Sequence, residues 1–130
     1  DVYKRQERGY LVSALGSDQR GQLAVRHLTE LGVDIEHCVI IDGTETGVSS
    51  VSLDSKGDAK YEIRENVAWD RLCYDSNLYP FFQSLHANCF GTLGQRTVKA
   101  HLETIKMLSA TKRECVKFFD LNLRQDFYTT

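Results

Sequence analysis

The stretch Gly9-Tyr10-Leu11-Val12-Ser13-Ala14-Leu15-Gly16-Ser17-Asp18 decides the fold class. Its first seven residues form a short, mainly apolar run, which predicts a buried β-strand that ends at Gly16. Asp18 is a good N-cap for a helix that continues until Gly32 stops it. One face of this helix is apolar at helical spacing, and its members are Leu23, Ala24, His27, Leu28 and Leu31. A strand followed directly by a helix is the building unit of α/β proteins.

After Gly32 the pattern changes to short β runs, at residues 35–41, 48–53 and 59–63. Residues 42–44 and 54–58 separate these runs and have the composition of turns. Tyr61 and Ile63 alternate with charged residues, as in an antiparallel hairpin or meander with one face open to solvent. We therefore expect residues of about 35–65 to stand apart from the main sheet.

The rest of the chain returns to helices and strands. A helix is expected after Leu72, where Pro80 either begins or interrupts it, followed by a strand at 85–90. A second helix has an apolar stripe and an outer pair of Lys99 with Glu103, and the stripe is Val98, Leu102, Ile105 and Leu108. The apolar run 116–121 predicts a parallel strand covered on both faces. This order favours an α/β fold with a mostly parallel sheet.

Composition excludes several classes of protein. With 42% hydrophobic and 26% charged residues, the 130-residue chain should form one ordinary globular core. The 16 basic and 18 acidic residues give a net charge of −2 without a basic block, so we expect no nucleic-acid partner. No apolar stretch approaches the roughly 20 residues of a membrane helix, and no secretory leader is visible. These features predict a cytoplasmic protein without a membrane partner.

The cysteines and histidines are scattered along the chain and show no metal or redox spacing. We expect reduced, structural thiols, and the four residues are Cys38, Cys73, Cys89 and Cys115. Cys89 and Cys115 lie in or beside apolar runs, which is typical of buried cysteine. No metal site is expected from either residue type.

Three polar segments follow predicted strands, at the carboxyl ends where open α/β sheets bind ligands. Gly16-Ser17-Asp18 with Gly21 either receives an anion at a helix start or is a tight turn whose aspartate caps the helix and repels phosphate. Gly91-Thr92-Leu93-Gly94 either contacts a ligand or only turns the chain. In Asp120-Leu121-Asn122-Leu123-Arg124, alternation places an acid, an amide and a guanidinium on one side. That set suits a hydroxylated or phosphorylated ligand, unless the run is merely solvated.

In this order, the segments resemble the ribokinase (PfkB) family of sugar kinases, and fructokinases in particular, over nearly the whole chain after residue 8. Residues 12–21 resemble the family's first glycine-aspartate-glycine segment, and 31–34 its usual helix exit. Thr46-Gly47 with 48–51 resembles the strand that enters the sugar-covering lid, and 65–70 the segment that leads back from it. Residues 88–93 resemble the family's strand and glycine loop, and 119–124 its Asp-x-Asn-x-Arg segment.

The resemblance implies a ribokinase-like three-layer α/β fold, with a mostly parallel sheet and a small β lid, incomplete at both ends. Residues 9–130 would be a partial kinase domain with lid strands at about 35–65, and 1–8 a junction unlike the family. The family's amino-terminal sugar-binding strand, its Gly-Ala-Gly-Asp motif and its metal-associated Asn-x-x-Glu segment are not found in this sequence. No catalytic or metal-binding residue is therefore assigned, and the catalytic base is expected beyond Thr130.

The implied activity is ATP-dependent transfer of the γ-phosphate to a sugar hydroxyl. ATP and Mg²⁺ would serve the complete enzyme, with neither assignable to residues of this chain, which is expected to be inactive alone. The substrate-binding residues implied are Thr46, Gly47, Gly91, Thr92, Asn122 and Arg124, with Asp120 in support. Fructose is the first substrate expected, from 65–70 and 124–128, with ribose, a 2-keto-3-deoxy sugar acid or a nucleoside as alternatives. Family members also suggest a homodimer formed through the lid.

Two other classes of function compete with the kinase. A non-catalytic sugar- or nucleotide-binding or assembly module could reuse part of a kinase fold, and the true ends of the reading frame would separate the two. A dinucleotide-binding dehydrogenase is disfavoured, because Gly16-Ser17-Asp18-Gln19-Arg20-Gly21 lacks the G-x-G-x-x-G order.

Overall fold

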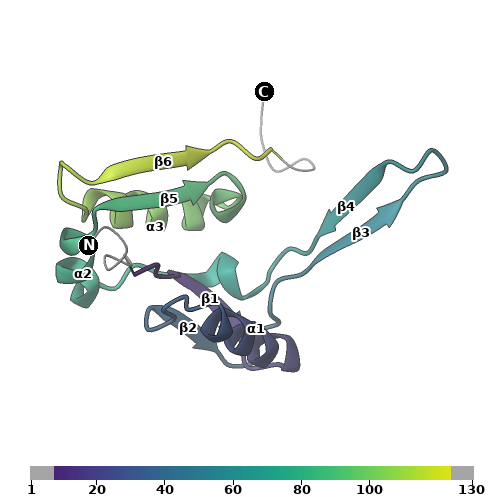
Figure 1. Cartoon of the computed structure of the whole chain (residues 1–130), viewed down its shortest axis with the longest axis horizontal. Coiled ribbons are helices and arrows are strands. Elements are labelled where there is room, and N and C mark those ends of the chain that lie inside the picture. The colour runs from purple at the N-terminus through teal and green to yellow at the C-terminus, as the bar shows by residue number, and fades with distance from the viewer. Residues whose placement is uncertain (1–7, 124–130) are drawn as a thin grey trace, which may run out of the picture. The chain divides into compact units, whose positions relative to one another are not determined.

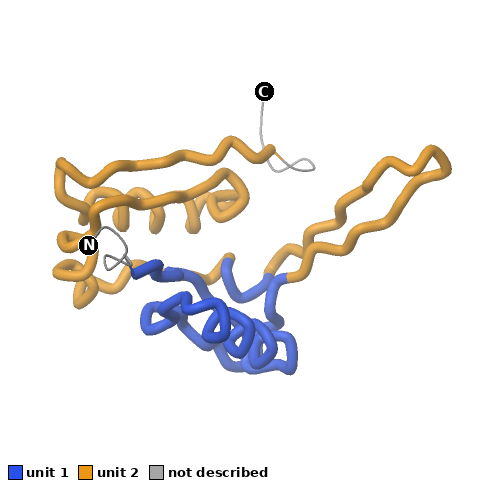
Figure 2. The backbone as a smooth tube through the Cα atoms, viewed as in Figure 1, with its two compact units in different colours: residues 1–47, 67–69 blue, residues 48–66, 70–130 orange. Residues whose placement is uncertain are grey.

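The computed structural model of the chain describes residues 8–123 and contains the element order of an α/β protein (Figure 1). The described residues form two compact units, which are distinguished in Figure 2. The first unit comprises residues 8–47 and 67–69, and the second comprises 48–66 and 70–123. The chain thus leaves the first unit at Gly47 and returns to it briefly at 67–69.

The first unit is a βαβ motif. Strand β1 (Ser13–Gly16) pairs in parallel with β2 (Cys38–Ile41), from Ser13 opposite Cys38 to Gly16 opposite Ile41. Helix α1 (Gln19–Glu30) connects them, capped by Asp18 and ended by Gly32 in the left-handed region at φ 73°. Ala14 and Leu15 of β1 are buried, so the predicted strand, turn and helix are confirmed, with the strand beginning at Ser13.

One expectation is wrong here: residues 38–41 belong to a parallel sheet and not to the β region that stands apart. Helix α1 returns the chain alongside β1, and a strand that follows such a crossover pairs in parallel. An apolar run has the same local pattern whether its partner is parallel or antiparallel, so only the tertiary structure separates these cases.

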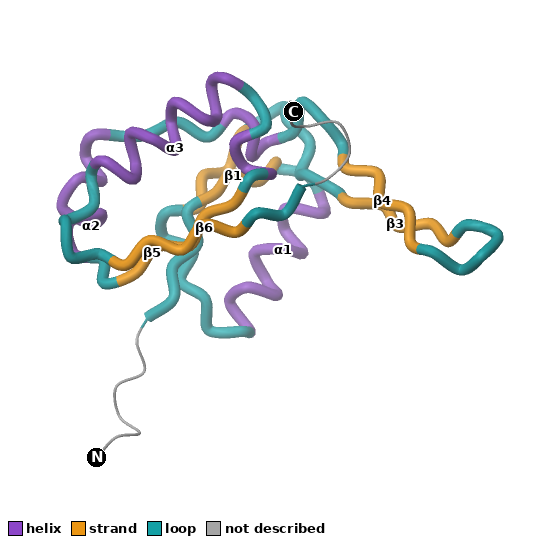
Figure 3. Tube along the Cα trace, turned by 90° about the horizontal axis from the view of Figure 1, so that it is seen from above, coloured by secondary structure: helices purple, strands orange, loops and turns teal. Residues whose placement is uncertain are grey.

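The second unit begins with an antiparallel hairpin, β3 (Ser49–Leu53) and β4 (Ala59–Ile63), labelled as two neighbouring strands in Figure 3. Its turn is built on Asp54, whose Oδ1 accepts bonds of 2.8 and 2.9 Å from the backbone N–H groups of Lys56 and Asp58. The register places Val51 opposite Tyr61. On this apolar face Val51, Leu53 and Tyr61 are 57%, 71% and 40% exposed, whereas Ile63 at the base of the hairpin is buried. Away from its base, the hairpin therefore has solvent on both faces among the described residues.

The remainder of the second unit supplies the other parallel pair. It contains η3 (Ser76–Leu78), α2 (Tyr79–Ser84), β5 (Ala87–Gly91), η4 (Leu93–Gln95), α3 (Val98–Ser109) and β6 (Val116–Asp120). The turn η2 (Ala68–Arg71) spans the boundary between the units. Pro80 lies in the first turn of α2, so it begins this helix rather than interrupting it. Phe82 is buried, with the rings of Phe81 and Tyr74 at 5.2 and 5.9 Å.

Strands β5 and β6 pair in parallel, as the alternation of strands and helices predicted, from Ala87 opposite Val116 to Gly91 opposite Asp120. The expectation that β6 is covered on both faces is wrong for the described residues, since every position of β6 is exposed. Phe119 stacks on Phe90 at 5.0 Å but remains half-exposed. An apolar run is typical of a strand whose two faces are buried by other elements, and among residues 8–123 no element buries β6 in this way.

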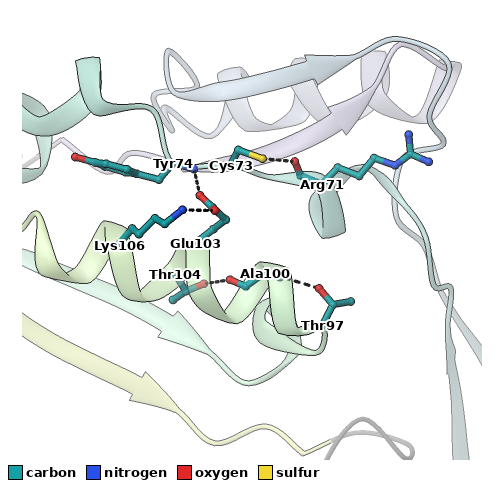
Figure 4. A network of polar contacts seen from close by, with 8 residues as sticks. All are labelled: Arg71, Cys73, Tyr74, Thr97, Ala100, Glu103, Thr104 and Lys106. Carbon is teal, nitrogen blue, oxygen red and sulfur yellow. Dashed lines mark hydrogen bonds and ion pairs between the residues drawn. The ribbon is translucent and has the colours of Figure 1, made fainter.

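Two smaller expectations about side chains also change. Cys89 is exposed on β5, whereas Cys115 is buried, and all four cysteines are free thiols. Glu103 does not pair with Lys99: it accepts bonds of 2.7 Å from Lys106 Nζ and from the backbone N–H of Tyr74 (Figure 4). Helix α3 points Glu103 toward the segment before α2, and Lys106 lies within reach on the same helix.

Candidate ligand site

In the first unit, the carboxylate of Asp18 joins the start of α1 to the segment that leads into the hairpin. Its Oδ1 accepts bonds from the Gly21 N–H at 2.8 Å and from the Thr46 hydroxyl at 2.6 Å. Its Oδ2 accepts a 3.0 Å bond from the Thr46 N–H. Thr46 Oγ1 in turn accepts a 2.9 Å bond from the Gly16 N–H, so this hydroxyl is already engaged within the protein.

These bonds bear on the two alternatives for the Gly16 turn, a phosphate-receiving turn and a tight turn with a capping aspartate. The hydrogen bonds from Thr46, and next those from its backbone and from Gly21, lower the pKa of Asp18 to about 2, so the group is a carboxylate at neutral pH. A negative charge therefore occupies the amino-terminal end of α1. The geometry favours the tight turn with its capping aspartate over a phosphate-receiving turn.

Gly47 lies against the indole of Trp69 in the same unit. A β-carbon at position 47 would overlap the six-membered ring of Trp69, so only glycine allows this approach. The Ala68 N–H donates a 2.9 Å bond to the Glu45 carbonyl, which joins the segments before and after the hairpin. Thr46 and Gly47, both predicted to bind substrate, thus lie where the hairpin leaves the first unit, and their contact with a ligand stays a prediction.

In the second unit, the four other described residues of the predicted site meet at the carboxyl ends of β5 and β6. Gly91 lies opposite Asp120 in the strand register. The Thr92 N–H donates to the Asp120 carbonyl at 3.2 Å, and the Thr92 hydroxyl to the Asn122 carbonyl at 2.9 Å. Asp120 and Asn122 are exposed, so their carboxylate and amide side chains are accessible to a solute. Arg124, predicted beside them, lies outside the described residues.

A buried ion pair near this edge was not predicted from the sequence. Arg96 Nε donates to Asp70 Oδ1 at 2.8 Å, and its Nη2 donates to Asp70 Oδ2 at 2.6 Å and to the Arg64 carbonyl at 2.5 Å. The side chains of Arg96 and Asp70 are only 2% and 8% exposed. Because 26 residues separate the pair, no local periodicity could have indicated it.

Within residues 8–123, no group of three or more His, Cys, Asp or Glu side chains is arranged to hold a metal ion. Of the helices in this part of the chain, none has the length and apolar character required to span a membrane.

Comparison with known proteins places the fold. No protein-family model matches the sequence, and no curated protein matches it. Solved structures do match: fructokinase from Xylella fastidiosa has a TM-score of 0.83 and 19% identity over 95% of this chain and 39% of its own. An uncharacterized sugar kinase from Pyrococcus horikoshii has a TM-score of 0.80 and 21% identity, covering 94% of this chain and 42% of its own. A PfkB family carbohydrate kinase from Listeria grayi has a TM-score of 0.81 and 16% identity over 95% and 40%.

The chain therefore has a ribokinase-like α/β fold, as predicted. More specifically, it has the fold of the PfkB and ribokinase sugar kinases, and it spans about two fifths of the length of the solved structures that it matches.

Proposed function

We propose that this chain is the sugar-binding part of an ATP-dependent carbohydrate kinase, with fructose as its substrate. The observation that carries the proposal is the group formed by Gly91, Thr92, Asp120 and Asn122 at the carboxyl edge of β5 and β6. Ligands of open α/β sheets bind at such an edge. The fold shared with sugar kinases makes a sugar the ligand class to test first.

In this proposal the chain supplies positioning groups. Exposed carboxylate and amide groups on Asp120 and Asn122 can bond sugar hydroxyls, and Arg124 would add a guanidinium beside them. The β3–β4 hairpin, which leaves the first unit after Thr46 and Gly47, would act as a lid that excludes water from the sugar. Phosphoryl transfer depends mainly on such positioning and on charge stabilisation.

In the proposed reaction, these 130 residues bind the sugar, and other residues supply the catalytic base. Related structures of the Pyrococcus sugar kinase and the Xylella fructokinase were solved with ATP, and we propose that ATP with Mg²⁺ serves this protein as well. No Gly-Ala-Gly-Asp motif occurs in this sequence, so the base that takes the proton of the sugar hydroxyl would come from outside it. The 130 residues alone would then bind sugar without turning over ATP.

The proposed setting is the cytoplasm, and the proposed assembly is a homodimer through the hairpin. The exposed apolar face of Val51, Leu53 and Tyr61 supports this assembly, since a second copy could cover it.

The decisive experiment is calorimetric titration of the chain with fructose, ribose, 2-keto-3-deoxygluconate and adenosine. Fructose should bind most tightly, and Asn122→Ala should weaken binding about tenfold through loss of one hydrogen bond to the ligand. Asn77→Ala, an exposed asparagine elsewhere in the second unit, is the matched control and should leave affinity unchanged. No binding of any sugar, or equal effects of the two variants, would refute the proposed site. The product of the full reading frame should also release ADP when fructose is present. Fructose binding with ADP release would indicate a kinase, and binding without it a non-catalytic module.

A further inference from the structure

The buried pair of Arg96 and Asp70 lies between two parts of the second unit that the proposed function uses separately. One is the ligand loop, defined here as residues 91–96, and the other is the β3–β4 hairpin. We propose that Arg96 is a positioning residue that ties the hairpin to the ligand loop, so that a sugar held at the loop also orders the hairpin. This inference rests on the proposed function for its ligand, but the link itself can be tested without one.

The link begins in a loop that hydrogen bonds hold together. Thr92 is joined to the end of β6 through the Asp120 and Asn122 carbonyls. The Gln95 side chain donates to the Gly91 carbonyl at 2.9 Å, and its N–H donates to the Thr92 carbonyl at 3.0 Å. The Arg96 N–H donates a 3.4 Å bond to the Leu93 carbonyl, so hydrogen bonds link the proposed sugar edge to the backbone of residue 96.

The other end of the link is the base of the hairpin. The Arg64 N–H donates a 3.1 Å bond to the Val48 carbonyl, which extends the β3–β4 pairing by one step. The carbonyl of the same residue accepts from Arg96 Nη2, so the guanidinium reaches the hairpin base directly. Apart from Ile63, every residue of β3 and β4 is exposed, so little of the surface of these two strands is buried.

The chemistry of the pair suits a fixed link better than an incidental surface contact. Two parallel bonds between guanidinium and carboxylate set both distance and orientation, which a lysine ammonium cannot reproduce. Burial of both charges demands that they stay paired, because a lone buried charge is strongly unfavourable. The third bond, to Arg64, adds the hairpin to this rigid arrangement. Two sites joined by such a contiguous network can influence each other, and the influence is reciprocal.

The test compares amide hydrogen exchange, measured by NMR without ligand, in three variants of the chain. Arg96→Lys keeps the charge but loses the two-pronged geometry, and Asp70→Asn removes the charge of its partner. In Arg96→Lys, amides of β3, β4 and Arg64 should exchange about tenfold faster, the factor expected for one lost charge-assisted bond. Asp70→Asn leaves the buried guanidinium without its counter-charge and should accelerate the same amides more strongly, while those of α3 stay unchanged in both variants. Lys106→Gln breaks the ion pair between the exposed Lys106 and Glu103 in the same unit and should leave the hairpin unaffected.

Two outcomes would overturn the inference. One is hairpin exchange in Arg96→Lys that equals that of Lys106→Gln. The other is that amide exchange accelerates equally in β5, α3 and the hairpin in both Arg96→Lys and Asp70→Asn. That result would mean that the pair stabilises the whole second unit and does not specifically link the hairpin to the ligand loop.

A second measurement adds fructose. In the wild-type chain fructose should slow exchange in the hairpin, and in Arg96→Lys it should still bind, with lower affinity, but no longer slow that exchange. Equal slowing in both proteins would contradict the link. If the wild type does not bind fructose at all, the proposed function fails, while the ligand-free comparison still decides whether Arg96 holds the hairpin.

Discussion

The hydroxyl of Thr46 donates a 2.6 Å hydrogen bond to Oδ1 of Asp18, a residue 28 positions earlier in the chain. The same carboxylate caps α1 through the Gly21 N–H. One side chain thus joins the start of the helix to the segment from which the hairpin departs. A substitution at Asp18 should therefore affect both the start of α1 and the segment before the hairpin, although these are far apart in sequence.

The bonds to Asp18 predict how stability depends on pH. Its pKa is lowered from 3.8 to about 2, chiefly by the Thr46 hydroxyl, so the folded state favours the charged form. The stability that this group contributes is fully present above about pH 4 and is lost as the pH falls toward 2. Asp18→Asn should lower the melting temperature at pH 7 and flatten its dependence on pH between 4 and 2.

Melting curves followed by circular dichroism from pH 2 to 6 would measure this effect. Asp58→Asn, at the exposed hairpin turn, is the control and should keep the wild-type profile. An unchanged slope in Asp18→Asn would mean that the bonds to Thr46 do not form in solution.

Gly47→Ala should destabilise the chain by about 1–3 kcal/mol, the usual cost of forcing an extra carbon into a packed contact. The added methyl would overlap the Trp69 ring, and either the ring or the backbone must move. Gly94→Ala is the matched control, since nothing lies within 4 Å of a β-carbon there. Urea unfolding would measure the free energy of unfolding of both variants. Equal values for the two would contradict the close contact between Gly47 and Trp69.

Replacement of residues 48–63 by a short Gly-Ser link should leave the rest of the chain folded while sugar affinity collapses. Apart from Ile63, the residues of the two strands are exposed, so removal of the hairpin takes only this one side chain from the core. Thermal melting and sugar titration of the shortened chain would be compared with the wild type. Loss of cooperative melting along with binding would show instead that the hairpin is part of the core.

Arg124→Ala, in the product of the full reading frame, should lower kcat/KM far more than it lowers stability. The guanidinium is expected to meet sugar or phosphate oxygens, and loss of such a bond costs about 1.5–3 kcal/mol. Steady-state kinetics with fructose and ATP would measure the change. Arg113, an exposed arginine between α3 and β6, provides the control variant Arg113→Ala. If kcat/KM stays within twofold of wild type in both variants, Arg124 is not a substrate-binding residue.

The isolated 130-residue chain should self-associate and show no fructose-dependent ADP release. On β6, Val116, Phe118 and Phe119 are at least half exposed, and a strand edge with free backbone groups attracts other copies. Phe118→Lys should reduce the mass measured by light scattering, because a charge on the strand discourages pairing. A monodisperse wild-type monomer with turnover above background would refute both halves of this prediction.

The sequence predicted the elements whose causes are local. Asp18 caps α1, Gly32 ends it, and the stripe from Val98 to Leu108 forms α3, because each depends on residues only a few positions apart. The glycine turn at 91–94 and the polar alternation after β6 were identified in the same way. Their meeting at one edge followed from the rule that parallel strands place their carboxyl ends together.

Only the tertiary structure decided which distant residues meet and which apolar surfaces are covered. It paired β2 with β1 rather than with the hairpin, left β6 exposed, and brought Arg96 to Asp70 and Asp18 to Thr46. The physical reason is that strand partners, buried ion pairs and burial itself are set by the whole folded chain. A single apolar run or a lone arginine has the same local pattern in any of these surroundings.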